Sequence, residues 1–389
     1  MSLQLAKVLD RVAGGAALRA LRPLRTLEDM LGRYGPRGPV RRIAVVKFWG
    51  VGNVALLLPV LRSLRRRYPS AELTAVTMPG NAPLLRGAVD RVLAVRMRPL
   101  HACVLDLARA AGALRRLRVD LALDFEQYVR TSQILLYLAG ARQTIAFDTP
   151  GLGRAALADV RVPYDDARHV SESFLDLARA SGVKEELYVP GGIEVDDAAS
   201  ERAALWARAR GAPPRPLVIL HPGSGDNFPG RRWPTRRFGL LARRLVDAEG
   251  AVVAVTGGAD ERGLAREVAE ASERPVEDLS GALPLDDLVA LLARASLLVS
   301  NDTGPVHIAS ALGVPVLALF GPNTPRLYGP LSPASASFYE PPPCSPCITN
   351  FNYKTSRCRN PVCIDAIALE AVAFAAVERL RARRRGTGT

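Results

Sequence analysis

The sequence predicts an α/β protein with two doubly wound domains, each built on a mostly parallel sheet. Three observations predict this class. The chain has 389 residues, more than one ordinary domain core accommodates. Between residues 43 and 147, apolar runs of strand length alternate with helix-period segments. Residues 296–320 repeat this pattern as strand, helix and strand, and both strands are continuous apolar runs, as in parallel sheets that are buried on both faces.

The expected elements form two series. The first series has strands at 43–46, 73–77, 92–95, 121–124 and 144–147, a helix that ends at Tyr68, and helices at 100–117, 132–138 and 170–180. The second series has strands at 217–220, 252–255 and 276–279, followed by the two strands of 296–320. Residues 190–214, rich in Gly and Pro, link the two series. We therefore expect a first domain over 41–195, a second over 196–363 that includes a cysteine-containing loop at 341–363, and a last helix with a basic tail over 364–389.

The first 40 residues precede the first series, and we call them the N-terminal extension. Their Leu and Val residues recur mostly three or four positions apart, with Arg and Lys between them, and the pattern ends at 35–39. This spacing predicts a basic amphipathic helix or a pair of helices. Two interpretations fit it: packing against the main body, or docking on an anionic membrane surface.

The chain is strongly basic, with a formal net charge of +14. The excess lies at both ends, because nine Lys and Arg stand against three Asp and Glu before residue 43, and five Arg lie within 379–385. Nucleic acid is not expected as a partner, since no helix-turn-helix, zinc-finger spacing or aromatic RNA-binding motif occurs. An anionic membrane surface or lipid substrate fits the charge better. No transmembrane run and no secretory signal is recognised, so a cytoplasmic location is expected.

A glycine-containing loop follows the first expected strand. Gly50, Gly52 and Ala55 have the G-x-G-x-x-A spacing of a dinucleotide fingerprint. The second strand should then end in an acidic residue that binds ribose, but it runs into Met-Pro-Gly at 78–80, which argues against NAD or FAD. The glycines instead predict a tight turn where a substrate approaches the backbone. Asp124, Glu126 and Gln127 follow the fourth strand and either face the same cleft or are solvated turn residues.

A polar cluster follows the first strand of 296–320. Asp302, Thr303 and His307 are expected at the carboxyl end of that strand, where open α/β sheets bind ligands. The amides of Thr303, Gly304 and the following turn begin a helix, so they are donors without intrahelical partners. Together with the helix dipole they predict an anion site, most naturally for phosphate. The alternative is that Asp302 or Thr303 only caps the helix.

Two motifs of the second domain carry a resemblance to a known family. They are Asn-Asp-Thr-Gly-Pro-Val-His at 301–307, continued by Ala-Leu-Gly-Val-Pro-Val-Leu-Ala-Leu-Phe-Gly-Pro at 311–322, and His-Pro-Gly-Ser-Gly at 221–225, continued by Arg-Arg-Trp-Pro at 231–234. In this order they resemble the heptosyltransferase family, glycosyltransferase family 9. The resemblance implies the GT-B architecture, with two Rossmann-like domains that face a cleft and a last helix that returns to the first domain. It also implies an inverting, metal-independent transfer of a sugar, first of all heptose from ADP-heptose, to a lipopolysaccharide-type or other glycolipid at the cytoplasmic membrane face.

The resemblance also assigns residues. The expected donor-binding residues are Ser224, Gly225, Arg231, Glu261, Asp302, Thr303, Gly304 and His307. Arg231 stands where the family has a phosphate-binding lysine, and Glu261 is placed to accept from ribose hydroxyls or else is only a first-turn helix carboxylate. Gly50 and Gly52 belong to the acceptor loop.

Asn53 stands where family members have an Asp that acts as base. Since an amide cannot take a proton, we expect Asn53 to orient the acceptor and Asp124, or failing it Glu126, to serve as base. A non-catalytic relative that binds a nucleotide sugar or an anionic glycan is the alternative function.

Four cysteines of the second domain have the spacing C-x2-C-x10-C-x4-C, at Cys344, Cys347, Cys358 and Cys363. This spacing is close to that of structural zinc sites. Stable disulfides are disfavoured in a reducing cytoplasm, so a structural zinc or simple packed thiols are expected. No cofactor is expected for catalysis.

Overall fold

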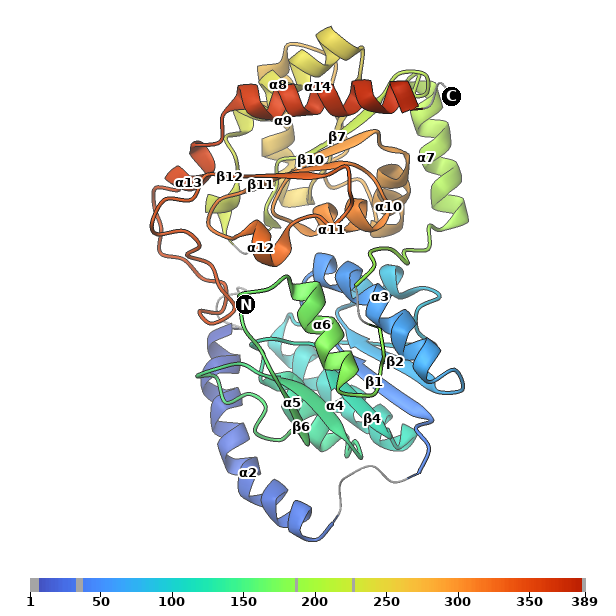
Figure 1. Ribbon diagram of the computed structural model, residues 1–389, viewed down its shortest axis with the longest axis vertical. Coiled ribbons are helices and arrows are strands. Elements are labelled where there is room, and N and C mark those ends of the chain that lie inside the picture. Colours follow the sequence, from blue (N-terminus) through green and yellow to red (C-terminus); the bar gives the residue numbers. More distant parts are fainter. Residues whose placement is uncertain (1–6, 33–37, 186–187, 226–227, 387–389) are drawn as a thin grey trace. The chain divides into compact units, whose positions relative to one another are not determined.

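Two parallel sheets of six strands each form the frame of the chain (Figure 1). The computed structural model describes residues 7–32, 38–185, 188–225 and 228–386. The chain divides into a first unit, residues 1–189 with 350–354, and a second unit, residues 190–349 with 355–389. Each unit carries one sheet covered by helices, so the predicted α/β class with two doubly wound domains is confirmed.

In the first unit the strands are β1 (Arg42–Val46), β2 (Glu72–Thr77), β3 (Arg91–Ala94), β4 (Leu121–Asp124), β5 (Thr144–Asp148) and β6 (Val160–Pro163). Their spatial order is β3-β2-β1-β4-β5-β6, and all neighbours are parallel. The covering helices are α3 (Val51–Arg67), α4 (Leu100–Leu117), α5 (Thr131–Leu138) and α6 (Val170–Arg179). β6 was not expected from the sequence, because its residues alternate between half-buried and exposed at the edge of the sheet.

The N-terminal extension belongs to the first unit and contains a π-helical turn η1 (Asp10–Gly14) and α2 (Gly15–Met30), which pack on the rest of that unit. Leu18 is buried, and the guanidinium of Arg25, also buried, pairs with Asp159. Asp10 accepts hydrogen bonds from the backbone amides that begin α5, at 3.0 Å from Arg130 N and 2.8 Å from Thr131 N. The inner face of the extension therefore packs on the main body. Its outer face carries exposed apolar side chains, at Leu24, Leu27 and Met30 among others.

In the second unit the strands are β7 (Leu217–His221), β8 (Val252–Val255), β9 (Glu277–Asp278), β10 (Leu297–Asn301), β11 (Val316–Phe320) and β12 (Ala336–Tyr339). Their order is β12-β11-β10-β7-β8-β9, again all parallel. The helices are α7 (Asp197–Ala209), α8 (Thr235–Glu249), α9 (Arg262–Ser272), α10 (Leu285–Arg294), α11 (Gly304–Ala311), α12 (Pro325–Tyr328), α13 (Val362–Asp365) and α14 (Leu369–Gly386). The large buried side chains of Trp233 and Phe238 pack edge to face in its core, with ring centroids 5.1 Å apart.

The last helix differs from its expected place. α14 packs against α8 of its own unit, and its buried stripe of Val372, Ala376 and Leu380 joins the core under that sheet. The stripe consists of apolar residues four positions apart, which suits burial along one neighbouring helix. The prediction that the last helix returns to the first domain is therefore wrong. The return to the first unit is made by residues 350–354, where Tyr353 packs on Tyr128.

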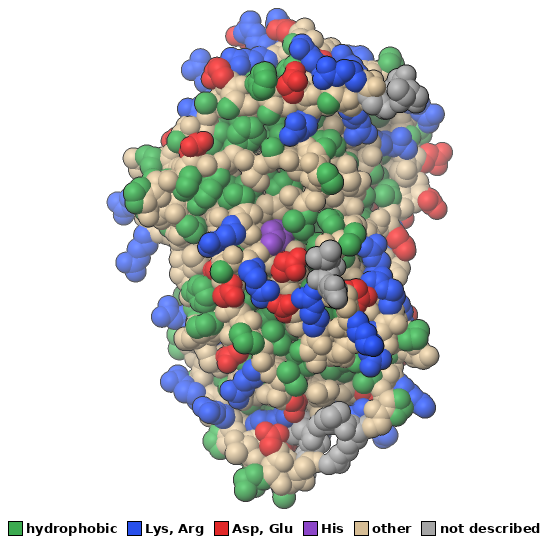
Figure 2. Space-filling view, in the orientation of Figure 1, with side chains coloured by type: hydrophobic (Ala, Val, Ile, Leu, Met, Phe, Trp, Pro, Cys, Tyr) green, Lys and Arg blue, Asp and Glu red, His purple; other side chains and the backbone are tan. Residues whose placement is uncertain are grey.

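Both sheets have the strand order of a Rossmann fold, in which the chain reverses direction across the sheet between the first and fourth strands. These switch points lie between β1 and β4 in the first unit and between β7 and β10 in the second. Lys and Arg side chains are dispersed over the displayed face with Asp and Glu among them (Figure 2). Within the described residues, no helix is long and apolar enough to span a membrane.

Candidate functional site

The switch point of the second unit joins the two sequence motifs. β7 and β10 are neighbours, and the loops that follow them are tied together by the buried side chain of Asn301. Its Nδ2 donates to the carbonyl oxygens of Pro222 at 2.7 Å and Gly223 at 3.2 Å, and its Oδ1 accepts from the amide of Trp233 at 2.9 Å. Asn301 thereby fixes three loop segments around one point. Asn301 belongs to the motif at 301–307, and nothing in the sequence pattern indicated this structural role.

Arg231 lies between the same loops. One terminal nitrogen donates to the Asp302 carbonyl oxygen at 2.8 Å, and the other contacts the Ser224 carbonyl oxygen. Burial lowers the pKa of Arg231, although the nearby Asp302 carboxylate raises it, and an arginine keeps its charge under such a shift. Its Nε is buried and has no hydrogen-bond partner among the described residues. Arg231 therefore brings a positive charge and an unused donor to the predicted phosphate site.

Asp302, Thr303 and Gly304 lead from β10 into α11. The Asp302 carboxylate accepts from Asn323 Nδ2 at 2.7 Å, which holds the loop. Thr303 is the N-cap residue in extended conformation, and the backbone amides at this helix start have no intrahelical acceptor. His307 lies one turn further on, buried, with its ring 6.2 Å from that of Tyr328. The arrangement suits an anion at the helix N-terminus.

Glu261 connects the loops after β7 and β8. Its carboxylate accepts from the backbone amides of Ser224, Gly225 and Gly258, each at 3.0 Å. Burial alone would raise the pKa of Glu261, but these bonds lower it, so the carboxylate stays ionised. A Cβ at Gly223 would lie 2.2 Å from this carboxylate, so only glycine allows the loop to pass so closely. The loop amides thus use three of about four acceptor directions of the carboxylate, and Arg232 Nη2 lies 3.6 Å from it as well.

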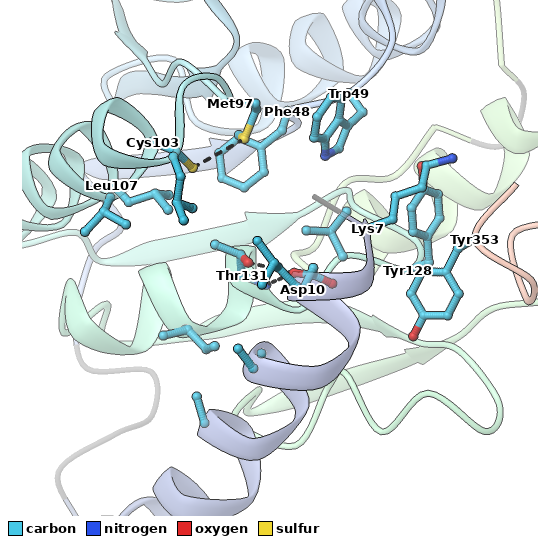
Figure 3. A pocket seen from close by; sticks show the side chains of 18 residues that line it. Lys7, Asp10, Phe48, Trp49, Met97, Cys103, Leu107, Tyr128, Thr131 and Tyr353 are labelled. Carbon is cyan, nitrogen blue, oxygen red and sulfur yellow. Dashed lines mark hydrogen bonds between the residues drawn. The ribbon is translucent and has the colours of Figure 1, made fainter. Parts of the chain in front are cut away.

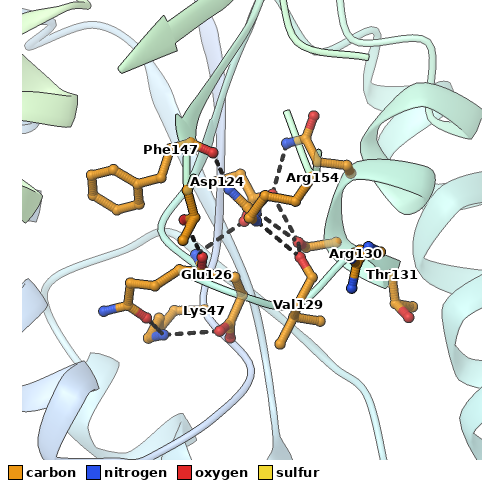
Figure 4. Close-up of polar contacts among 12 residues, drawn as sticks. Lys47, Asp124, Glu126, Val129, Arg130, Thr131, Phe147 and Arg154 are labelled. Atoms are coloured by element: carbon orange, nitrogen blue, oxygen red, sulfur yellow. Dashed lines mark hydrogen bonds and ion pairs between the residues drawn. The ribbon is translucent and has the colours of Figure 1, made fainter. Parts of the chain in front are cut away.

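The switch point of the first unit holds the glycine loop. Glu126 is fully buried and its Oε1 accepts from the amides of Phe48 at 2.6 Å and Trp49 at 3.1 Å, while its Oε2 pairs with Lys47 Nζ at 3.0 Å (Figure 4). The turn that follows needs the positive φ of 85° at Gly50, which glycine adopts without strain. Gly52 is buried within the first turn of α3. Glu126 therefore braces the loop.

Asn53 lies in the same turn, close to Gly50. A Cβ at Gly50 would lie 2.9 Å from Asn53 Nδ2, so the side chain covers the backbone of the turn. Its Oδ1 is buried and has no hydrogen-bond partner among the described residues. A buried acceptor without a partner is rare, and it is satisfied when a ligand supplies a hydroxyl or amine donor.

Asp124 is a fully buried structural residue. Its carboxylate pairs with the guanidinium of Arg154, which is also fully buried, and accepts from Ser132 Oγ and Gln133 Nε2, each at 2.7 Å (Figure 4). Because Asp124 is fully buried and its carboxylate is engaged by these side chains, it presents no accessible oxygen to an acceptor hydroxyl. We therefore assign Asp124 to the support of the carboxyl end of β4, a central strand of the sheet. Nothing in the sequence pattern indicated Arg154 as its partner.

The four cysteines lie in the second unit with their thiols free of disulfides. Cys347 Sγ is 3.3 Å from Ser356 Oγ, Cys363 is buried, and Cys344 and Cys358 are exposed. In the described part of the chain, no group of three or more His, Cys, Asp or Glu residues is arranged to hold a metal ion. The expected structural zinc stays a prediction.

Comparison with known proteins points to one family. Residues 107–355 match the sequence profile of glycosyltransferase family 9 (heptosyltransferase). Lipopolysaccharide heptosyltransferase 2 of Escherichia coli K12 is 27% identical over 305 residues, which cover 75% of this chain and 86% of that protein. The family 9 glycosyltransferase of Veillonella parvula has a similar structure, with a TM-score of 0.74, 23% identity and coverage of 88% of this chain and 97% of its own. The E. coli heptosyltransferase WaaC with ADP has a TM-score of 0.67 at 20% identity, covering 87% and 99%. These similarities confirm the predicted GT-B architecture.

Proposed function

The chain belongs to glycosyltransferase family 9 and is a glycosyltransferase, and we propose that it moves heptose from an ADP-linked heptose to a lipopolysaccharide-type glycolipid. The observation that carries this proposal is the meeting of both motifs at the switch point of the second unit, where Arg231 and the first amides of α11 surround one point. The relatives support the sugar and the acceptor, since E. coli lipopolysaccharide heptosyltransferase 2 is named for them, and WaaC is described with ADP.

The diphosphate of the donor would lie at this switch point. Negative charge builds on the leaving diphosphate as the glycosidic bond breaks, and fixed donors stabilise it. Arg231 would supply its charge and its unused Nε, and the amides of Thr303 and Gly304 would hold phosphate oxygens. His307 and Asp302 would border the diphosphate and the sugar. Glu261 would position the Ser224 and Gly225 loop and accept from a ribose hydroxyl.

The acceptor hydroxyl would approach the glycine loop of the first unit. It would donate a hydrogen bond to the unpartnered Oδ1 of Asn53 and attack the anomeric carbon from the side opposite the diphosphate, which inverts the configuration. Asn53 orients the hydroxyl without taking its proton, because an amide has no useful proton affinity. Neither Asp124 nor Glu126 is proposed as base, since both are fully buried and held by cations. The proton then passes to solvent during transfer, which makes the chemical step slow for this family.

The second candidate function is binding of a nucleotide sugar without turnover, and Asn53 is the observation that favours it. The variant Asn53→Asp separates the two. For a working transferase we expect acceptor-dependent ADP release by the wild type and a rise of about 10²-fold or more in Asn53→Asp, the usual range for a placed base. If both proteins bind ADP-heptose and neither releases ADP with acceptor present, the chain is a binding protein.

We further propose that transfer takes place at the cytoplasmic membrane face, with the N-terminal extension on anionic lipid. The support is the basic composition of the extension and its exposed apolar side chains Leu24, Leu27 and Met30. Flotation with anionic vesicles, comparing the full chain with one that starts near Arg41, tests this. Equal flotation of both would assign the extension to packing alone.

A further inference from the structure

An apolar pocket of about 330 Å³ lies where the N-terminal extension meets the rest of the first unit (Figure 3). The extension forms one wall through Ala13 and Ala17, and α4 forms the opposite wall through Cys103 and Val104. Its volume lies within the range of about 300–1,000 Å³ that is typical of small-molecule sites. Phe48 and Trp49, which lead directly into the glycine loop, also line it. The pocket is therefore joined to the proposed acceptor loop through two consecutive residues.

Two polar side chains that line this pocket, those of Asp10 and Tyr353, are already engaged. The Asp10 carboxylate accepts from the amides that begin α5, and from Thr131 Oγ1 at 2.6 Å. The hydroxyl of Tyr353 is hydrogen-bonded to the guanidinium of Arg130. A polar ligand would gain few new hydrogen bonds there, whereas a hydrocarbon chain would gain burial against the apolar walls. At the rim, Leu100 and Val104 are 49% and 58% exposed, so the entrance itself is apolar.

A second pocket, of about 390 Å³, is formed by the same extension and the same unit. Five arginines and one carboxylate, that of Asp148, line it: Arg11, Arg19, Arg22, Arg130 and Arg161. We call it the arginine pocket. Throughout the described residues, none of these five guanidinium groups is paired with a carboxylate. Uncompensated guanidinium groups around a hollow are suited to phosphate oxygens, which they bind through paired N–H groups.

We propose that the N-terminal extension and the first unit together bind a phosphorylated lipid, with an acyl chain in the apolar pocket and phosphate groups in the arginine pocket. Both pockets use η1 and α2 as a wall, and they combine the two chemistries that a phosphorylated bilayer lipid presents. The choice of lipid rests on the proposed glycolipid acceptor. One acyl chain of the lipid would thereby be held in the apolar pocket, in addition to the contact of the lipid headgroup with basic side chains.

The apolar pocket is tested with decyl phosphate and octyl phosphate below their micelle-forming concentrations. Cys103 is a reporter, because it lines the pocket, and its alkylation by iodoacetamide is followed by mass spectrometry, with the exposed Cys344 as internal reference. We expect decyl phosphate to protect Cys103 with about 15-fold higher affinity than octyl phosphate, from about fourfold per methylene. Val104→Trp should abolish protection, and Leu105→Trp, which changes a comparably exposed residue of α4 outside the pocket, should retain it. No protection, or equal protection in both variants, would overturn the placement of an acyl chain in the apolar pocket.

The arginine pocket is tested by vesicle flotation. With phosphatidylglycerol in phosphatidylcholine vesicles, Arg22→Gln and Arg161→Gln should each weaken binding about fivefold, and Arg116→Gln, an exposed change on α4, should not. Inorganic phosphate is added as a competitor, to distinguish binding of a free phosphate ion from binding of the phosphate in a lipid headgroup. If it displaces vesicles completely at millimolar concentration, or if all three variants bind equally, the phosphate assignment is wrong. Neither assay contains a nucleotide sugar, so lipid binding without sugar transfer would remove the proposed function and leave this inference in place.

Discussion

Replacing Asp124 by Asn separates a structural from a catalytic role for the carboxylate that the sequence analysis expected to be the base. The substitution preserves volume but leaves the fully buried Arg154 without its counter-ion. Removing one partner of a buried ion pair costs about 3–5 kcal/mol, since a charge is left uncompensated in a site of low polarity. For a unit of this size, a change of 1 kcal/mol shifts the unfolding temperature by about 2–4 °C, so a decrease of about 6–20 °C is expected.

Calorimetry of the whole chain measures this shift, with Asp165→Asn as the matched control. Asp165 is exposed, and its side chain accepts from the backbone amide of Ala167 at 2.7 Å, a hydrogen bond that the amide oxygen of Asn also accepts, so its replacement should change the unfolding temperature little. The double variant Asp124→Asn, Arg154→Gln should regain part of the loss, because it removes the uncompensated charge. Turnover per folded molecule should stay within a few-fold of wild type. An unchanged unfolding temperature together with a hundredfold loss of turnover would refute the structural role and restore Asp124 as base.

Three further outcomes are expected in the second unit. Arg231→Ala should weaken ADP binding about 10- to 150-fold, which corresponds to a loss of about 1.5–3 kcal/mol for one charge-assisted contact. The control Arg236→Ala, which changes an exposed residue of α8, should leave ADP binding unchanged. Equal affinities of both variants in titration calorimetry would remove Arg231 from the site. Burial lowers the pKa of His221 to about 4, below its value of about 6.5 in the unfolded chain, so stability is full above pH 6.5 and falls as the pH is lowered towards 4. His221→Asn should flatten the unfolding temperature of this unit over that interval, and a slope like that of wild type would contradict the assignment. For the cysteines of 344–363, a structural zinc predicts about one equivalent of zinc or iron in protein purified without chelator, whereas packed thiols predict less than a few tenths of an equivalent.

The parts of the fold that the sequence predicts well are those with local signals. β10 and β11 are continuous buried apolar runs, and polar residues at 301–304 follow the end of the first run. The sequence therefore predicted both the βαβ unit and the position of the site. The glycine loop after β1 could be predicted in the same way, because it follows a buried apolar strand and precedes a helix. Strand ends and motifs therefore predicted which residues stand at each switch point.

Contacts between residues that are far apart in the sequence could not be predicted from local sequence patterns. Arg154 is one of 52 Lys and Arg residues and lies 30 positions from Asp124, so no local pattern singles it out. Helix α14 carries an apolar stripe, which predicts that one face of the helix is buried but not which helix it packs against. The predicted contact with the first domain was therefore wrong. The engagement of Glu261 by three loop amides likewise follows from tertiary structure, since Ser224 and Gly225 lie more than 35 positions away.

The most direct test of the proposed function is sugar transfer itself. The full chain is incubated with ADP-heptose and a lipopolysaccharide core acceptor that lacks heptose, and ADP release and acceptor mass are measured together. We predict ADP release that depends on the acceptor, with the acceptor gaining the mass of one heptosyl residue, and loss of both signals in Arg231→Ala at donor concentrations that saturate the wild type only. ADP release that is the same without acceptor, or an acceptor of unchanged mass although ADP-heptose binds, would contradict heptosyl transfer by this protein.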